Sequence, residues 1–199
     1  MFIDPPVGYR IYRRRIVPAR EGLRVLRLCH PCRVPDAAPT FCWSTGSAGA
    51  AWDLWMTRLF EPVLGPALVQ ALHHARAGHL REIVRIDAGL DDQMRPGEAD
   101  RSRTQGRRLL IGMVPPAGVR SLCRYRQKAI EDRVPGHLAP VFAMRAAAFH
   151  VSTRAAVAAY LQGEWHGATG EDGLPPGQLR IPGLPECPRH SHPHGQPAP

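Results

Sequence analysis

The sequence has no long hydrophobic run. None of its apolar stretches approaches the roughly 18 residues that indicate a membrane-spanning helix. The first ten residues, MFIDPPVGYR, lack the apolar core of a signal peptide. We therefore expect a cytoplasmic protein that does not enter a membrane. Its 199 residues suffice for one domain with tails, or for a small pair of domains, around a substantial core.

Lysine is almost absent. Lys128 is the only one among 26 basic residues, so the formal charge of +9 comes almost entirely from arginine. A GC-rich genome explains such a bias, and the other interpretation is an acidic partner, either protein or nucleic acid. Arg120, Arg124 and Lys128, with Arg101 and Arg108 one predicted helix earlier, form a basic face that could contact phosphates. An arginine-rich helical nucleic-acid-binding protein is therefore the alternative function.

Strand patterns are missing outside residues 7–17, and no solenoid-type repeat is present. Between residues 41 and 166, apolar residues instead recur every three or four positions, which is the period of one helical face. We predict an all-α protein with a single helical bundle domain over residues 41–166. An irregular basic segment (residues 1–40) precedes it, and a Pro/His-rich tail that is disordered by composition (residues 167–199) follows.

Small and cyclic residues predict several helix ends. Gly78 suits the C-cap of a helix over residues 63–77, and Ser152 is a good N-cap for the last helix. Pro62 is expected to stop or restart the preceding helix, because a proline ring clashes with the backbone inside an α-helix.

Residues 78–110 are expected to form a helical hairpin around a Pro-Gly turn. The first helix has Asp87 on its inward side, whereas Asp91 and Asp92 are expected to point elsewhere, and Pro96 begins the second helix. Neither helix can bury its apolar face alone, so the rest of the chain must pack against both. The inward face of the first helix consists of Leu80, Ile83, Val84, Asp87 and Leu90.

Cysteine is scarce, and the odd count of five argues against a disulfide framework in a cytosolic chain. Cys29 and Cys32 form a CxxC that could bind zinc or nickel, but no second ligand pair accompanies them. A redox pair would need a strand–helix context, and two incidental loop cysteines are the simplest interpretation. The tail histidines could bind nickel, zinc or copper weakly, or have no role; they are His190, His192 and His194.

Catalytic motifs are incomplete. Ser44 lies in CWSTG, where Cys42 replaces the first glycine of a nucleophile elbow and no strand precedes the serine. The run GSAG at residues 46–49 lacks the GK[ST] ending of a phosphate-binding loop. We therefore expect a protein that scaffolds or recognises others, with no enzymatic activity and no required cofactor.

Three stretches, taken in order, carry a family resemblance. Together they resemble the urease accessory protein F family, over roughly residues 41–178. The matching positions are residues 41–46 (FCWSTG); Ala77-Gly78, Asp87, Arg101-Ser102 and the GRRLL run from Gly106 to Leu110; and Gly136-His137, Pro140-Val141-Phe142, Ala159-Tyr160-Leu161 and Gly177-Gln178. Both ends of the chain diverge from the family pattern.

The resemblance implies an all-helical, non-catalytic component of a nickel chaperone complex. Such a protein binds the D/H-type accessory protein, recruits the G-type GTPase and docks on apo-urease; a homodimer is a further expectation. A basic surface would suit acidic partner faces. The resemblance marks as partner-binding or fold-determining the residues Ser44, Gly46, Arg101, Gly106, Arg107, His137 and Tyr160, and helix packing is the simpler interpretation of Gly106 and Tyr160.

Overall fold

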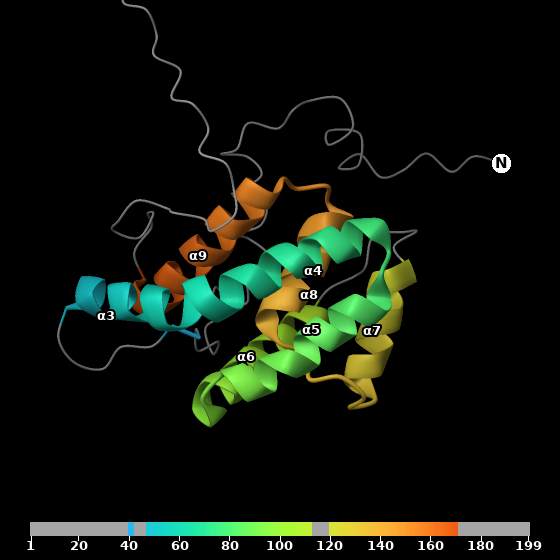
Figure 1. Ribbon diagram of the computed structural model, residues 1–199, viewed down its shortest axis with the longest axis horizontal. Helices are drawn as coiled ribbons and strands as arrows, with labels where there is room; N and C mark the ends of the chain where they lie inside the picture. Colours follow the sequence, from blue (N-terminus) through green and yellow to red (C-terminus); the bar gives the residue numbers. More distant parts are fainter. Residues whose placement is uncertain (1–39, 42–46, 113–119, 171–199) are drawn as a thin grey trace, which may run out of the picture.

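The computed structural model describes residues 40–41, 47–112 and 120–170, and these residues contain helices and no strand (Figure 1). The predicted all-α fold class is confirmed. None of the described helices is long and apolar enough to cross a membrane. The helices are α3 (Ala48–Trp55), the π-helix η2 (Met56–Leu64), α4 (Gly65–Ala77), α5 (Leu80–Gln93), α6 (Pro96–Ile111), α7 (Arg120–Ile130), α8 (Leu138–Ala148) and α9 (Thr153–Thr169).

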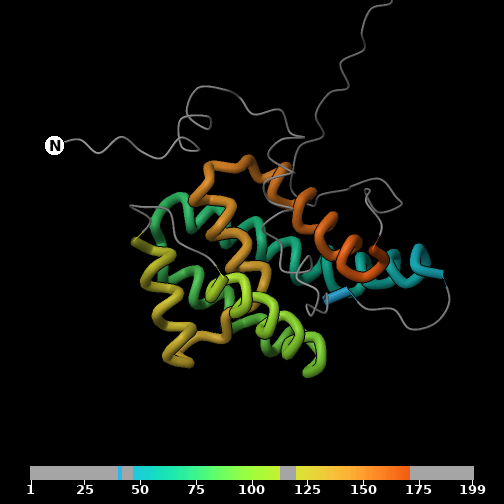
Figure 2. The backbone as a smooth tube through the Cα atoms, turned by 180° about the vertical axis from the view of Figure 1, so that it is seen from behind, coloured from blue at the N-terminus to red at the C-terminus, as the bar shows by residue number. Residues whose placement is uncertain are grey.

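Helix α8 lies at the centre of the bundle. Its sequence, LAPVFAMRAAA, is apolar on all sides apart from Arg145, and every other residue in it is buried. Its many alanines allow neighbouring helices to approach closely. Helix α4 crosses it on one side and α6 packs against it on another, as opposite views of the bundle show (Figures 1 and 2). The predicted helices are therefore arranged around one small-residue helix.

Most predicted helix ends agree with the structure. Gly78 is the left-handed C-cap of α4, with φ of 75°, and the Ser152 hydroxyl accepts a hydrogen bond from the Ala155 N–H at 3.2 Å. Pro96 is the first residue of α6. The last helix, α9, extends past residue 166 to Thr169.

The prediction for Pro62 was wrong, because the helix neither stops nor restarts there. Pro62 lies inside η2, which continues α3 directly into α4. In an α-helix a proline ring clashes with the carbonyl of residue i−4. A π-helix pairs residues five apart, and this wider turn accommodates the proline within a continuous helix.

The predicted helical hairpin of α5 and α6 is also packed less closely than expected. Ile83, Asp87 and Leu90 are buried, as the helical period indicates. However, α5 and α6 contact one another at few points, and α6 packs more extensively on α8. The chain that leads into α8 makes hydrogen bonds with both helices, and this arrangement holds them apart.

A buried carboxyl group joins the two ends of the described chain. Glu164 of α9 accepts a hydrogen bond from the Phe41 N–H at 3.0 Å. The Phe41 ring packs between Trp52, at 5.0 Å, and Trp165, at 6.2 Å between ring centroids. Burial raises the pKa of Glu164, although the hydrogen bond from the Phe41 N–H and the nearby polar groups of Thr40 and Tyr160 partly oppose this shift. Residues 40–41 are thus fixed to α9 by both an aromatic cluster and a polar contact.

We predict that Glu164→Gln makes stability less sensitive to pH. The pKa of Glu164 is higher in the folded chain than the ordinary value of 4.5. Its contribution to stability is therefore complete below that value and is lost as pH rises through the folded-state pKa. The variant does not titrate, and its amide oxygen can still accept the Phe41 N–H. Urea unfolding should show that the free energy of unfolding of Glu164→Gln, relative to that of wild type, is more favourable at pH 7.5 than at pH 4.5.

Glu61→Gln, at a partly exposed position in η2, is the matched control and should follow the wild-type pH profile. The other buried titratable groups are unchanged in both variants, so their contributions cancel in the comparison. Parallel pH profiles for wild type and Glu164→Gln would contradict the prediction.

Candidate functional site

The loop that leads into α8 makes hydrogen bonds with two other helices. We call Pro135, Gly136, His137 and Leu138 the junction. The Asp87 carboxylate of α5 accepts hydrogen bonds from the N–H groups of Gly136, at 2.9 Å, and His137, at 2.8 Å. The Leu138 N–H donates to the Ser102 hydroxyl of α6 at 3.2 Å. The first N–H group of α8, that of Leu138, has no partner within the helix and is bonded by α6, while α5 fixes the two residues just before the helix.

Gly106 allows α6 to approach the junction closely. A Cβ atom placed on Gly106 would lie 2.0 Å from the Gly136 carbonyl oxygen and 2.7 Å from the His137 carbonyl carbon. These are backbone atoms, which cannot move aside as the end of a flexible side chain can. Gly136 itself has φ of 78°, a left-handed conformation that favours glycine. Two glycines therefore make the contact between α6 and the junction possible.

The electrostatics of Asp87 reflect its burial. Loss of solvation raises its pKa, while the neighbouring Tyr125 side chain and the hydrogen bonds from the two junction N–H groups limit the shift. Burial and the neighbouring Asp87 raise the pKa of Tyr125 well above its ordinary value, so this residue remains a neutral phenol. The carboxyl group is thus enclosed by donors on several sides.

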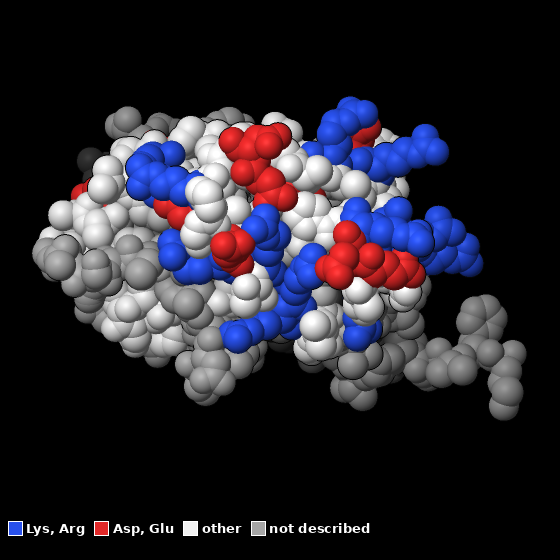
Figure 3. Space-filling view, turned by 90° about the horizontal axis from the view of Figure 1, so that it is seen from below, with Lys and Arg blue, Asp and Glu red and all other residues white. Residues whose placement is uncertain are grey.

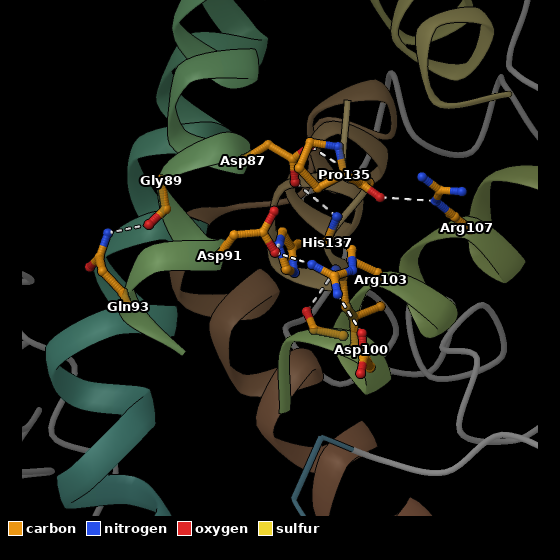
Figure 4. Close-up of polar contacts among 12 residues, drawn as sticks. Asp87, Gly89, Asp91, Gln93, Asp100, Arg103, Arg107, Pro135 and His137 are labelled. Atoms are coloured by element: carbon orange, nitrogen blue, oxygen red, sulfur yellow. Dashed lines mark hydrogen bonds and ion pairs between the residues drawn. The ribbon is translucent and has the colours of Figure 1, made fainter. Parts of the chain in front are cut away.

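An ion-pair network surrounds this centre (Figure 4). The buried His137 ring contacts Asp91 of α5 through Nε2 at 3.1 Å, and Asp91 also pairs with Arg103 of α6. Burial lowers the pKa of His137, although the nearby Asp87 and Asp91 oppose the shift. Arg107 donates to the Pro135 carbonyl at 3.0 Å and pairs with Asp132 at 2.6 Å. The junction is therefore held from both helices by neutral and charged contacts.

The amino-acid sequence matches one known protein family. The family model for UreF matches residues 37–168, which cover α3 through α8 and almost all of α9. The chain belongs to the UreF family. No curated protein and no solved structure gives a significant match. UreF is a family of urease accessory proteins, generally non-catalytic, that interact with other urease accessory proteins.

The residues marked by the resemblance to UreF proteins have different surroundings. Gly106 and Arg107 of α6 meet His137 at the junction, although His137 lies about 30 residues further along the sequence. Tyr160 is buried in α9, with its ring 5.5 Å from that of Phe142 and 6.1 Å from that of Phe60. Partly buried Arg101 forms no hydrogen bond or ion pair with a described residue. Ser44, Gly46, Cys29, Cys32, His190, His192 and His194 lie outside the described residues.

Helical spacing alone could have revealed part of the network. Asp91 was predicted to point elsewhere, and this was wrong: it lies four residues after the inward-facing Asp87, so both occupy one side of α5 and Asp91 faces His137. Helical spacing gave no comparable signal for the contacts of Ser102 with Leu138, of Arg103 with Asp91 or of Tyr125 with Asp87, because these partners are distant in the sequence. Within residues 40–41, 47–112 and 120–170, no group of three or more His, Cys, Asp or Glu side chains is placed to hold a metal ion.

We predict that Gly106→Ala destabilises the fold by at least about 2 kcal/mol, because the added methyl group overlaps the backbone of the junction. Chemical denaturation followed by circular dichroism measures the effect. Gly97→Ala is the control in the same helix, since the nearest atom to its added Cβ would be the end of the Arg101 side chain at 4.0 Å. Equal stability of the two variants would show that the close approach is absent.

We predict that Asp87→Ala destabilises the fold by about 2–5 kcal/mol, because two buried N–H groups lose their acceptor. Asp87→Asn keeps one acceptor oxygen and should lose less. Asp92→Ala, at an exposed position on α5, should change the unfolding free energy by less than about 0.5 kcal/mol. A smaller loss for Asp87→Ala than for Asp87→Asn would exclude the capping role.

Proposed function

We propose that this chain is a non-catalytic scaffold of the urease maturation complex. In this proposal it binds the D/H-type accessory protein and the G-type GTPase, and presents them to apo-urease for nickel insertion. The observation that supports it is the UreF family match over residues 37–168. The nickel is cargo delivered to urease. The chain itself requires no resident cofactor, and His190, His192 and His194 contribute at most weak nickel binding.

The use of polar groups within the bundle supports a scaffolding role. Asp87, Asp91 and Glu164 each hold backbone or side-chain donors from another part of the chain. Glu98 likewise accepts hydrogen bonds from Arg58 and from the Arg95 N–H at 3.3 Å. Burial raises the pKa of Glu98, but these contacts outweigh burial and the net shift is downward. Acids of this kind stabilise a rigid shape, and a rigid shape is what a scaffold presents to partners.

The proposal predicts the outcome of deleting the gene. Urease protein should accumulate normally, but its nickel content and activity should fall, because the partners are no longer brought to apo-urease. Immunoblotting measures the protein and inductively coupled plasma mass spectrometry measures the metal. Expression of the wild-type chain in trans should restore both nickel and activity. Normal nickel content in the deletion strain would overturn the proposal.

A co-purification experiment with the accessory proteins of the same operon tests the physical association. Tagged wild-type chain should retain the D/H-type protein and, in its presence, the G-type GTPase. A gel shift with duplex DNA and with single-stranded RNA at low ionic strength tests the nucleic-acid alternative alongside. Binding of nucleic acid without either protein would favour that alternative.

A further inference from the structure

Helix α7 has an exposed basic face. Arg120, Arg124 and Lys128 lie four residues apart and therefore follow one side of the helix. We call these three residues the α7 stripe. Arg120 and Arg124 are exposed and Lys128 is half-buried, and none forms an ion pair with a described residue. The opposite side of α7, with Leu122, Tyr125 and Ala129, is buried in the bundle.

Acids near the stripe are already engaged elsewhere. Glu131 accepts a hydrogen bond from Gln127 at 2.6 Å and pairs with Arg133 at 3.1 Å. Asp132 pairs with Arg107 at 2.6 Å. The arginines beside the junction, in contrast to those of the stripe, have acidic partners. In Figure 3, basic and acidic side chains are interleaved across much of the face shown.

The positive charges of the α7 stripe destabilise helix α7 when no partner is bound. Like charges at a spacing of four residues repel one another along a helix. Arg120 is also the first described residue of α7, near the end where the helix dipole is positive and favours an anion, and the first described turn contains no acid. An acidic surface placed against α7 would relieve both effects. The charge of the stripe therefore identifies the chemistry of what it would bind.

The remaining residues of this face favour a protein over a nucleic acid. Ile130 is 56% exposed, and Cys123 and Gln127 share its side of the helix next to the stripe. The stripe spans about 12 Å along the helix axis, which is enough for one acidic helix or loop. Arginine beside an apolar residue is typical of protein interfaces, whereas an exposed isoleucine gains little from a phosphate backbone. A second copy docking by this same face would place two basic stripes against each other.

We propose that the exposed face of α7 docks an acidic surface of another urease accessory protein, with the α7 stripe supplying the charge and Ile130 the apolar contact. This inference rests on the proposed scaffolding function. It names the face of the bundle through which one partner is held.

Arg124→Glu tests the inference with the full chain. The new carboxylate lies four residues from both Arg120 and Lys128, so the helix should fold at least as well as before. Arg154→Glu is the matched control, because Arg154 is an exposed arginine of α9 with no ion pair to a described residue and the same change of charge. Circular dichroism and thermal unfolding confirm that both variants are folded.

Biolayer interferometry is carried out with the purified D/H-type accessory protein and, separately, the G-type GTPase. Arg124→Glu should weaken binding of one of them by about ten-fold or more at 0.15 M salt and flatten its salt dependence, while Arg154→Glu stays close to wild type. Ile130→Ser should weaken the same partner with little change in the salt dependence.

Other outcomes overturn the inference. Unchanged binding of both proteins by Arg124→Glu, with wild-type binding intact, rejects the α7 face and leaves the scaffolding proposal in place. Equal losses for Arg124→Glu and Arg154→Glu indicate a general charge effect and also reject it. If Arg124→Glu loses binding to duplex DNA or single-stranded RNA while its binding to both accessory proteins is unchanged, the stripe is a nucleic-acid-binding site and the inference is rejected. If the wild-type chain binds neither accessory protein, the scaffolding proposal and the inference fail together.

Discussion

The contact between the Asp87 carboxylate and the two N–H groups at the start of α8 is the constraint on which the described structure depends. Helix α8 is almost wholly buried, and so are Gly136 and His137 just before it, so the N–H groups of these residues and of Leu138 have no water to bond with and need internal acceptors. Asp87 and Ser102 provide them from two different helices. The position of the central helix therefore determines where α5 and α6 lie, and the absence of a side chain at Gly106 allows the three to meet.

The same physical solution appears at the other end of the bundle. Glu164 accepts the Phe41 N–H just as Asp87 accepts those of the junction, and in both places burial raises the pKa of the acid. A buried acid carries a desolvation penalty, and hydrogen bonds from the backbone limit that penalty while tying together segments distant in the sequence. In this chain, buried carboxyl groups connect segments that are far apart in the sequence.

This use of acids inside and arginine outside fits a protein whose work is recognition. The buried carboxyl groups hold the helices in one arrangement. The charged side chains that a partner could contact lie at the surface. Proteins of the UreF family, to which this chain belongs, interact with other urease accessory proteins. The α7 stripe differs from the other basic side chains near it, because the acids closest to it, Glu131 and Asp132, already pair with Arg133 and Arg107. Charge on a rigid helix of this kind influences how fast and how selectively a partner binds.

Local sequence determined the helices and most of their ends. Apolar residues at helical spacing, Gly78, Pro96 and Ser152 act through neighbouring backbone atoms, so they could be interpreted without the fold. The order of family-like stretches also pointed to UreF before any coordinates were considered. Only the tertiary structure placed residues 135–138 between α5 and α6, turned Asp91 toward His137 and showed why Gly106 cannot carry a side chain. It also carried the chain through Pro62 in a π-helix. These features depend on atoms that are far apart in the sequence or on a balance of packing around the whole bundle, and no periodic pattern along one helix contains that information.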